Sequence, residues 1–402
     1  MTYLDWAATT PCDRNILKKA LDASIETFAN PSSPHSPGLA AKALLEDSRS
    51  TLLASLTTLS GGRKPEGGLA FTASGTEADQ IPLLALFRQL RKGAVPASAG
   101  TAKPHLLISA IEHSAIHAQA EALSRLGFDL SLVKPDRDGI VQPSRVAEAL
   151  RPSTRLVAVM AVNNETGAVQ DIAAIGKAIA SAASSLGTRL PLFHVDCVQA
   201  LGKLRSDFLG GIVTSAAFSA HKIQGPKGVG ALWYGKPIEA LALGGGQEGG
   251  VRSGTENLFG IAAFALCAAS AKASMDSRLD RALVLERRLL EGLEEIPGAR
   301  VIPQGRKAGD PRWSPWIASA AFPGLGGEVL ARALSDEGIA VSTGSACSHT
   351  QATKGRRILR AMDLPEDLSF SSVRVSFGPG TETGEVDLFL SKAEDLYRRL
   401  KT

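Results

Sequence analysis

Residues 213–222 read Val-Thr-Ser-Ala-Ala-Phe-Ser-Ala-His-Lys, a mostly apolar run that ends at Lys222. A second apolar run, residues 191–195, is followed directly by Asp196. Short apolar runs of this length, bounded by polar residues, are typical of buried strands. The sequence therefore predicts two buried strands, with a lysine and an aspartate just past their ends.

Lys222 and Asp196 are a pair of residues that a pyridoxal phosphate enzyme requires. A lysine holds the cofactor aldehyde as a Schiff base, and an aspartate keeps the pyridine nitrogen protonated so that the ring can store electrons. A lysine near a strand end is more often a solvated charge. The cofactor hypothesis therefore depends on what the rest of the chain contains.

The composition is that of a globular protein long enough for two or three domains, with 402 residues and 44% hydrophobic residues. The formal charge of +4 gives no argument for nucleic-acid binding. Four cysteines, Cys12, Cys197, Cys267 and Cys347, lack Cys-x-x-Cys spacing, which argues against a zinc site and favours a reducing compartment. No apolar run approaches the ~20 residues that cross a bilayer. We expect a soluble, cytoplasmic protein.

The middle of the chain alternates short apolar runs with longer helical patterns. The expected strands are residues 69–72, 105–109, 155–160, 191–195, 213–218 and 228–234, and the expected helices are about 76–92, 113–127, 143–150 and 171–186. This alternation predicts a mainly parallel sheet covered on both faces, with ligands beyond the carboxyl ends of its strands. Asp196, Lys222, His113 and Asn164 fall at those ends.

The pattern of apolar and polar residues changes near residue 258. A long helical region is expected at about 258–296, with an expected break near Ser274. After it, strands are expected near 317–321, 339–342 and 372–377, and helices around 327–336, 355–362 and 383–400. We expect three parts: an N-terminal active-site segment, 1–15, that joins the small domain; a large cofactor domain, 16–257; and a linking helix with a small α+β domain, 258–402. The polar stretch 305–316 is predicted to be a surface loop.

Two glycine-bearing segments are candidates for binding a phosphate. Residues 73–78, Ala-Ser-Gly-Thr-Glu-Ala, lie between a strand and a helix, where backbone N–H groups and the helix dipole favour an anion. Alone, this segment indicates no more than a helix N-cap. Residues 244–255 are unusually rich in glycine, which suits either close approach to a ligand or neighbouring subunit, or a flexible hinge.

Taken in order, these segments resemble the cysteine desulfurases, which are pyridoxal phosphate enzymes of the aspartate aminotransferase fold. The resemblance runs from residue 3 to about 378 and rests on eleven segments in the same order: 3–11, 30–35, 71–77, 112–113, 162–167, 194–199, 219–222, 225–228, 252–255, 344–347 and 371–374. It implies an α/β fold with a mainly parallel seven-stranded sheet in a large cofactor domain and a smaller α+β domain.

The resemblance also implies a role for each matching residue. Lys222 would hold the cofactor and then move protons, Asp196 would pair with the pyridinium nitrogen, and Gln199 would donate to the phenolic oxygen. His113 would stack on the ring and handle protons. The phosphate would be bound by Gly75, Thr76, Ser219 and His221. Thr255 would reach the phosphate of a partner subunit, which implies a homodimer.

Asn164, also a cofactor contact, and Arg374 would hold the substrate carboxylate, the arginine as a bidentate fork. The alternative for Arg374 is a surface charge. Its place within the run Val-Arg-Val-Ser-Phe, residues 373–377, disfavours this, because an unpaired arginine among apolar residues would be costly.

Cys347 decides the predicted reaction. It lies in the polar, small-residue segment 342–349, which is unlike a packed core and typical of a loop. The resemblance implies that Cys347 takes sulfur from L-cysteine, releases L-alanine and carries a persulfide to an acceptor such as an iron–sulfur scaffold or a sulfur carrier. The basic segment 354–360 either steers an acidic partner or merely begins a helix in solvent.

Several alternatives remain on the sequence alone. Selenocysteine lyase, aminotransferase and β-lyase activities use the same fold, although an aminotransferase has no use for a loop thiol. A non-catalytic scaffold should have lost some of Lys222, Asp196, Arg374 and Cys347, and this chain retains all of them. The sequence indicates neither membrane nor direct nucleic-acid binding.

Overall fold

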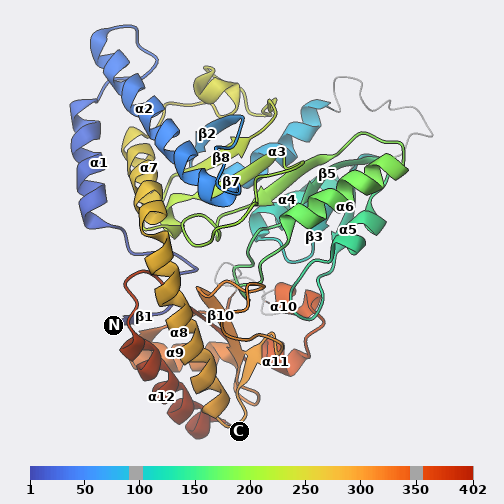
Figure 1. Ribbon diagram of the computed structural model, residues 1–402, viewed down its shortest axis with the longest axis vertical. Helices are drawn as coiled ribbons and strands as arrows, with labels where there is room; N and C mark the ends of the chain where they lie inside the picture. The colour runs from blue at the N-terminus through green and yellow to red at the C-terminus, as the bar shows by residue number, and fades with distance from the viewer. Residues whose placement is uncertain (90–102, 345–355, 402) are drawn as a thin grey trace.

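Figure 1 shows the computed structural model, which describes residues 1–89, 103–344 and 356–401. Its central layer is a seven-stranded sheet in the order β2-β8-β7-β6-β5-β3-β4. The strands are β2 (Gly68–Thr72), β3 (His105–Ser109), β4 (Asp129–Val133), β5 (Thr154–Ala158), β6 (Leu192–Asp196), β7 (Ser215–Ser219) and β8 (Gly230–Tyr234). Strand β8 runs antiparallel to both neighbours, and the other pairs are parallel. The expected mainly parallel seven-stranded sheet is confirmed.

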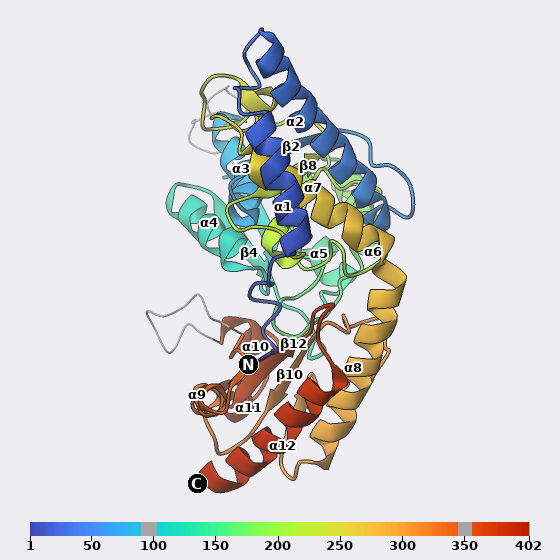
Figure 2. The same cartoon turned by 90° about the vertical axis from the view of Figure 1, so that its left-hand side faces the viewer.

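Helices cover both faces of this sheet because its strands alternate apolar side chains between the two faces. Leu107, Val157 and Phe193 share one core with helices α2, α5, α6 and α7, whereas Leu106 and Leu156 share another with α3 and α4. The helices of this unit are α1 (Arg14–Glu26), α2 (Ser36–Ser55), α3 (Gly75–Gln89), α4 (Ser114–Arg125), α5 (Pro143–Ala149), α6 (Ile172–Ser185) and α7 (Leu258–Ala273). Figure 2 shows α1 and α2 beside α7.

A smaller unit follows the bend of 72° between α7 and α8 (Met275–Glu295), which confirms the expected break near Ser274. It contains an antiparallel sheet in the order β12-β10-β9. Its remaining elements are β9 (Arg300–Ile302), β10 (Ile317–Ala321), α9 (Gly327–Asp336), β11 (Ile339–Ala340), α10 (Arg357–Ala361), α11 (Glu366–Phe370), β12 (Ser372–Ser376) and α12 (Thr383–Leu400).

The start of the chain belongs structurally to this smaller unit. Strand β1 (Thr2–Tyr3) pairs in parallel with β11, and Leu4 is fully buried in the core formed by α8, α9 and α12. Helix α7 instead packs on α1 and α2 of the larger unit. The division of the chain at residues 15 and 257 stays a prediction.

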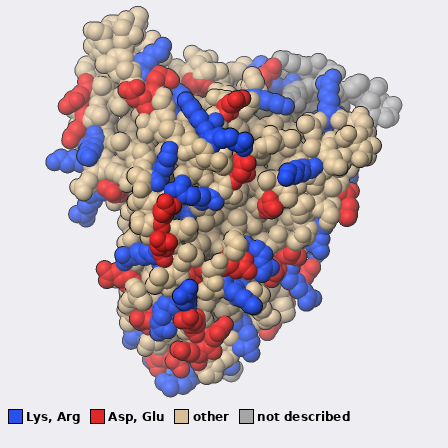
Figure 3. Space-filling model, viewed as in Figure 1, with Lys and Arg blue, Asp and Glu red and all other residues tan. Residues whose placement is uncertain are grey.

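The helices and the surface add two observations. Among the described residues, no single helix has the length and apolar character needed to cross a membrane, and the bent pair α7 and α8 passes that test only when taken together. On the face seen in Figure 3, cationic and anionic side chains are interspersed. This distribution matches the small formal charge of +4.

The stretch 305–316 is a loop with exposed residues, as its composition predicts, but Arg306 within it points inward. Arg306 is buried and forms an ion pair of 2.7 Å with Glu286 of α8. Its guanidinium also donates to the carbonyl oxygens of Thr166, Ser314 and Ile317. The arginine therefore joins three segments inside the protein and anchors an otherwise exposed polar loop.

We expect Glu286→Gln to destabilise the cofactor-free protein by about 3–5 kcal/mol, because it leaves the buried Arg306 cation unpaired. Urea unfolding measures the change. Asp276→Asn is the matched control, since it breaks the exposed Arg205–Asp276 pair and should leave the unfolding midpoint unchanged. Equal midpoints for wild type and Glu286→Gln would contradict a structural role for this pair.

Candidate active site

A cavity of about 380 Å³ lies at the carboxyl ends of β6 and β7, where it meets the smaller unit. This volume is in the range of small-molecule sites. Ten of the residues predicted from sequence line it: Gly75, Thr76, His113, Asn164, Asp196, Gln199, Ser219, His221, Lys222 and Arg374. Cys347 lies outside the described residues. Thr255 lies elsewhere, as described below.

One end of the cavity is built to hold an anion. Helix α3 begins at Gly75, so its first backbone N–H groups point toward this end of the cavity, and the Oγ of Ser74 caps the helix by accepting from the N–H of Glu77 at 3.1 Å. A Cβ at Gly75 would lie 2.9 Å from a methyl group of Val198, and one at Gly230 would lie 2.4 Å from the carbonyl carbon of Ser74. Glycine at both positions therefore allows the turn to sit this close to the sheet.

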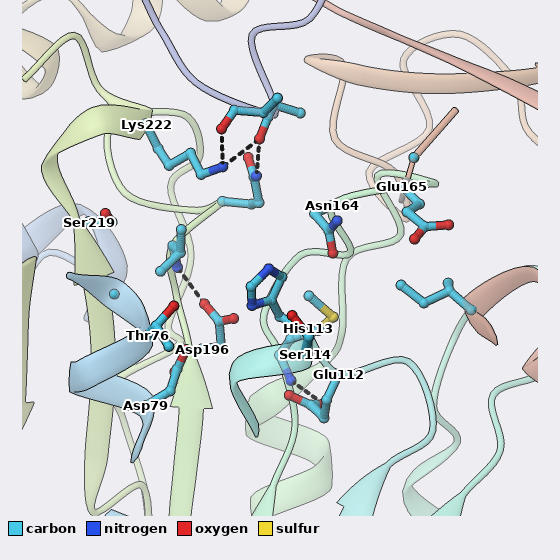
Figure 4. Close-up of a pocket in the computed structure, with 18 of the residues that line it drawn as sticks. Thr76, Asp79, Glu112, His113, Ser114, Asn164, Glu165, Asp196, Ser219 and Lys222 are labelled. Atoms are coloured by element: carbon cyan, nitrogen blue, oxygen red, sulfur yellow. Dashed lines mark hydrogen bonds between the residues drawn. The ribbon is translucent and has the colours of Figure 1, made fainter. Parts of the chain in front are cut away.

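Asp196 ends β6 at the base of the cavity. Its Oδ1 accepts from the N–H of Val198 at 2.9 Å, as Figure 4 shows. Burial, and next the neighbouring Asp79, raise the pKa of Asp196 to about 8. The carboxyl of the unliganded protein therefore carries a proton at neutral pH, and it can share that proton with a nitrogen base.

Asp79 is a second buried acid beside Asp196, and the sequence did not single it out. Its Oδ1 lies 3.1 Å from Nε2 of His194, whose Nδ1 lies 2.9 Å from Oγ of Ser215. Burial raises the pKa of Asp79 well above its usual range and lowers the pKa of His194 to about 4. This hydrogen-bonded group supports the base of the cavity without adding a net charge to it.

Lys222 closes the short helical turn Ala220–Lys222 after β7. Its Nζ donates to the carbonyl oxygens of Ala7 and Ala8, each at 2.7 Å (Figure 4). The adjacent His221 carbonyl accepts from both the N–H and the hydroxyl of Thr10. The N-terminal segment thus lies along this turn and orients the lysine amine.

His113 caps helix α4 and points into the same cavity (Figure 4). Its Nδ1 accepts from the N–H of Ala115 at 3.2 Å, so the proton of a neutral ring is on Nε2. Burial, followed by the positive charges of Lys222 and Arg357, lowers the pKa of His113 to about 4. The imidazole is therefore neutral at physiological pH and presents an N–H donor.

Arg374 of β12 is only 3% exposed, so the alternative of a surface charge is wrong. Its guanidinium donates to the carbonyl oxygen of Asn164 at 2.8 Å and to Oδ1 of Asp5 at 2.6 Å. Within the described part of the chain, Nε of Arg374 and Oδ1 of Asn164 are buried without a hydrogen-bond partner. Unsatisfied buried groups that line a cavity indicate a polar ligand.

The basic segment does begin a helix, α10, but Arg356 and Arg357 turn inward, and of its described arginines Arg360 alone is exposed. Arg356 is buried and donates to Oγ of Ser372 and to the carbonyl oxygen of Thr343, each at 2.7 Å. Arg357 lines the cavity and donates to the carbonyl oxygens of Ala110 and Glu112. The positive charge of a segment does not show that its side chains point inward, because their hydrogen-bond acceptors lie in other segments of the chain.

Two glutamates of the cavity wall were part of recognised segments but were given no role. Burial raises the pKa of Glu112 to about 8 and that of Glu165 to about 7. Oε1 of Glu112 accepts from the hydroxyl of Ser109 and the N–H of Met160, while its Oε2 is buried without a partner among the described residues. These hydrogen bonds with Ser109 and Met160 hold the Glu112 side chain inside the protein. Such contacts cannot be read from the sequence.

Thr255 does not line the main cavity. It lines a small separate one together with Glu248 and Arg252. The loop between Gly246 and Gly250 is anchored there, because the buried Glu248 carboxylate accepts from the N–H of Phe71 at 2.8 Å and pairs with Arg49 at 2.6 Å. This loop is therefore held in place rather than acting as a free hinge, and the role of Thr255 toward a partner subunit stays a prediction.

Comparison with known proteins agrees with this geometry. The family model described as "Aminotransferase class-V" matches residues 2–389. The chain is 36% identical over 409 aligned positions to a cysteine desulfurase IscS of Pectobacterium atrosepticum, which covers 99% of this chain and 93% of that protein. A solved NifS-like protein has a TM-score of 0.83 at 30% identity, over 99% of both chains. A structure of SspA in complex with cysteine has a TM-score of 0.71 at 26% identity, over 94% of this chain and 99% of that one.

The fold and the cavity are therefore those of a class V aminotransferase, and the chain belongs to that family, whose members depend on pyridoxal phosphate. Relatives that match it over nearly its whole length include proteins named cysteine desulfurase IscS.

The buried Glu112 predicts how stability depends on pH. Because its pKa rises from 4.5 to about 8 on folding, the folded state keeps a proton that the unfolded state loses in this window. The contribution of Glu112 to the free energy of unfolding of the cofactor-free protein should therefore fall as the pH rises from 4.5 to 8, by up to about 1.4 kcal/mol per pH unit.

Urea unfolding across that window measures the slope. Glu112→Gln should make the slope of the free energy of unfolding against pH less negative. Glu148→Gln, at an exposed position, should not change this slope. A slope that is identical in wild type and Glu112→Gln would show that Glu112 is ionised in the folded protein.

Proposed function

We propose that this protein is a pyridoxal phosphate-dependent cysteine desulfurase that converts L-cysteine to L-alanine and forms a persulfide on Cys347. The observation that carries the proposal is the content of one cavity. It joins the Lys222 amine, the protonated Asp196 carboxyl, the anion-binding turn at Gly75 and the unsatisfied Nε of Arg374.

The residues of this cavity fit the cofactor. Gly75, Thr76, Ser219 and His221 would hold the phosphate, and Asp196 would share its proton with the ring nitrogen. His113 would lie on the ring face, with Asn164 and Gln199 at its edge. When bound, pyridoxal phosphate stores the electrons of the bond that breaks at the substrate.

The protein's own groups bind the substrate and move its protons. Nε of Arg374 and the Asn164 amide would take the carboxylate of L-cysteine, because both side chains line the cavity with unsatisfied polar atoms. Nζ of Lys222 would accept the α-proton. The carbonyl oxygens of Ala7 and Ala8, which accept from this amine, would orient it toward the substrate.

Cys347 would attack the substrate sulfur, so that an S–S bond forms while the C–S bond of L-cysteine breaks. Its assignment comes from the sequence. It is supported by the described residues on either side of the segment 345–355, since Gly344 and Arg357 both line the cavity. The chain therefore enters and leaves that segment next to the substrate site.

The direct test measures alanine and sulfide together, after incubation of the holoenzyme with L-cysteine and a thiol reductant. We expect equal amounts from wild type and neither product from Cys347→Ala or Lys222→Ala. Cys12→Ala is the matched control, because Cys12 is a free and exposed thiol outside the cavity. Alanine formation that does not need Cys347, or a strong preference for selenocysteine, would overturn the proposal.

Arg374→Lys tests the carboxylate site separately. A lysine keeps the charge but not the planar fork, so it cannot make the bonds to Asn164, Asp5 and the substrate together. We expect kcat/KM for L-cysteine to fall by about 100-fold, since one charge-assisted hydrogen bond of a buried pair is worth roughly 1.5–3 kcal/mol. Steady-state kinetics measure this. A kcat/KM within twofold of wild type would remove Arg374 from the substrate site.

The proposal includes a homodimer in which Thr255 of each subunit contacts the phosphate bound by its partner. Sulfur would pass to an acceptor protein, such as an iron–sulfur scaffold or a sulfur carrier. We propose the cytoplasm as the compartment, because Cys12, Cys197 and Cys267 are free thiols, which a reducing environment favours.

A further inference from the structure

Lys203 is a buried lysine next to the cavity that none of the roles above uses. It follows β6 in the chain, is 8% exposed, and its backbone carbonyl accepts from Nε1 of Trp316 at 2.9 Å. Its Nζ donates to Oε1 of Gln199 at 2.7 Å. Burying an ammonium group costs free energy unless it is hydrogen-bonded. The bond to Gln199, its one side-chain acceptor among the described residues, therefore stabilises Lys203.

The bond from Lys203 determines how the Gln199 amide is oriented. A lysine amine donates, so the amide oxygen must face Lys203 and the amide NH₂ must face the other way. That NH₂ donates to the carbonyl oxygen of Ala7 at 2.9 Å. The same oxygen accepts from Nζ of Lys222 at 2.7 Å. Three hydrogen bonds therefore connect Lys203, Gln199, Ala7 and Lys222 in series.

Lys203 interacts electrostatically with cationic residues of the cavity. Burial, and then the positive charges of Lys222 and Arg374, lower the pKa of Lys203 to about 7. A small adjoining cavity is lined by Lys203, Lys222 and Arg278 but by no acidic residue within the described part of the chain. Of these cations, Lys222 acts electrostatically on Lys203.

We propose that Lys203 is a positioning residue, which orients the Gln199 amide and through it controls the protonation of the Lys222 nitrogen. This inference rests on the proposed function, because it concerns the cofactor joined to Lys222. Lys203 keeps the Gln199 N–H groups pointed at Ala7 and at the place where the phenolic oxygen of the cofactor would lie. Its positive charge disfavours a second positive charge on the Lys222 nitrogen.

The test is a pH titration of the cofactor absorbance in the holoenzyme, because the protonated and unprotonated forms of the cofactor joined to Lys222 absorb at different wavelengths. Lys203→Met keeps an unbranched side chain only one atom shorter and removes its charge and donor. We expect the midpoint of the titration to rise by about one pH unit, since a nearby cation is lost and the Gln199 donor is no longer oriented.

Gln199→Glu is the second variant, for the case in which Lys203→Met does not fold. It keeps an acceptor for Lys203 but cannot donate to Ala7, so the midpoint should rise here as well. Lys272→Met is the matched control. The Lys272 amine donates to the carbonyl oxygen of Ala54, outside the cavity, and its loss should not move the midpoint.

The outcomes separate this inference from the proposed function. A wild-type titration that neither Lys203→Met nor Gln199→Glu shifts would overturn the inference and leave the desulfurase proposal standing. A wild-type holoenzyme without a titrating cofactor band would overturn the cofactor proposal and the inference with it. A purely structural role of Lys203 would lower cofactor occupancy or thermal stability at an unchanged midpoint, which would also contradict the inference.

Discussion

The site depends on the way residues 5–10 bridge the two units of the protein. On one side, Asp5 pairs with Arg374 at 2.6 Å. On the other side, the carbonyl oxygens of Ala7 and Ala8 accept from Lys222. Pairing of β1 with β11 ties the start of this segment to the smaller unit. A single short segment thus contacts both Lys222 and Arg374, each contributed by a different unit.

This arrangement explains how so many ionisable groups share one buried cavity. The acids Asp196 and Glu112, whose pKa values are raised to about 8, carry protons at neutral pH, so burying them does not bury negative charge. His113 is neutral because burial lowers its pKa to about 4. Backbone carbonyl oxygens, rather than carboxylates, accept from Lys222 and Arg357. Backbone dipoles therefore hold these two side chains, while Arg374 is paired with Asp5.

The sequence predicted most of the sheet and most of the site, because both follow from local patterns that fall at strand ends. It missed β4, where Asp129 and Ser131 interrupt the apolar pattern at the sheet edge, and it did not predict α1 and α2. It also did not predict that the side chains of Arg306, Arg356 and Arg357 point into the protein. Their acceptors are mostly carbonyl oxygens from distant segments, and such tertiary contacts leave no periodic signal in the chain. Lys203 escaped notice for the same reason, since its partner Gln199 is polar and uncharged.

The excess of positive charge in the cavity has a chemical consequence for the ligands it suits. Lys222, Arg374 and Arg357 line the cavity, burial raises the pKa values of its Asp196 and Glu112 carboxyls to about 8, and the N-terminus of α3 adds its dipole. A ligand that carries a phosphate at one end, together with a substrate that brings a carboxylate at the other, would supply the missing negative charge. A neutral or cationic ligand would leave Arg374 with an unsatisfied buried Nε. The electrostatics thus favour ligands that bring a phosphate and a carboxylate, as the proposed cofactor and substrate would.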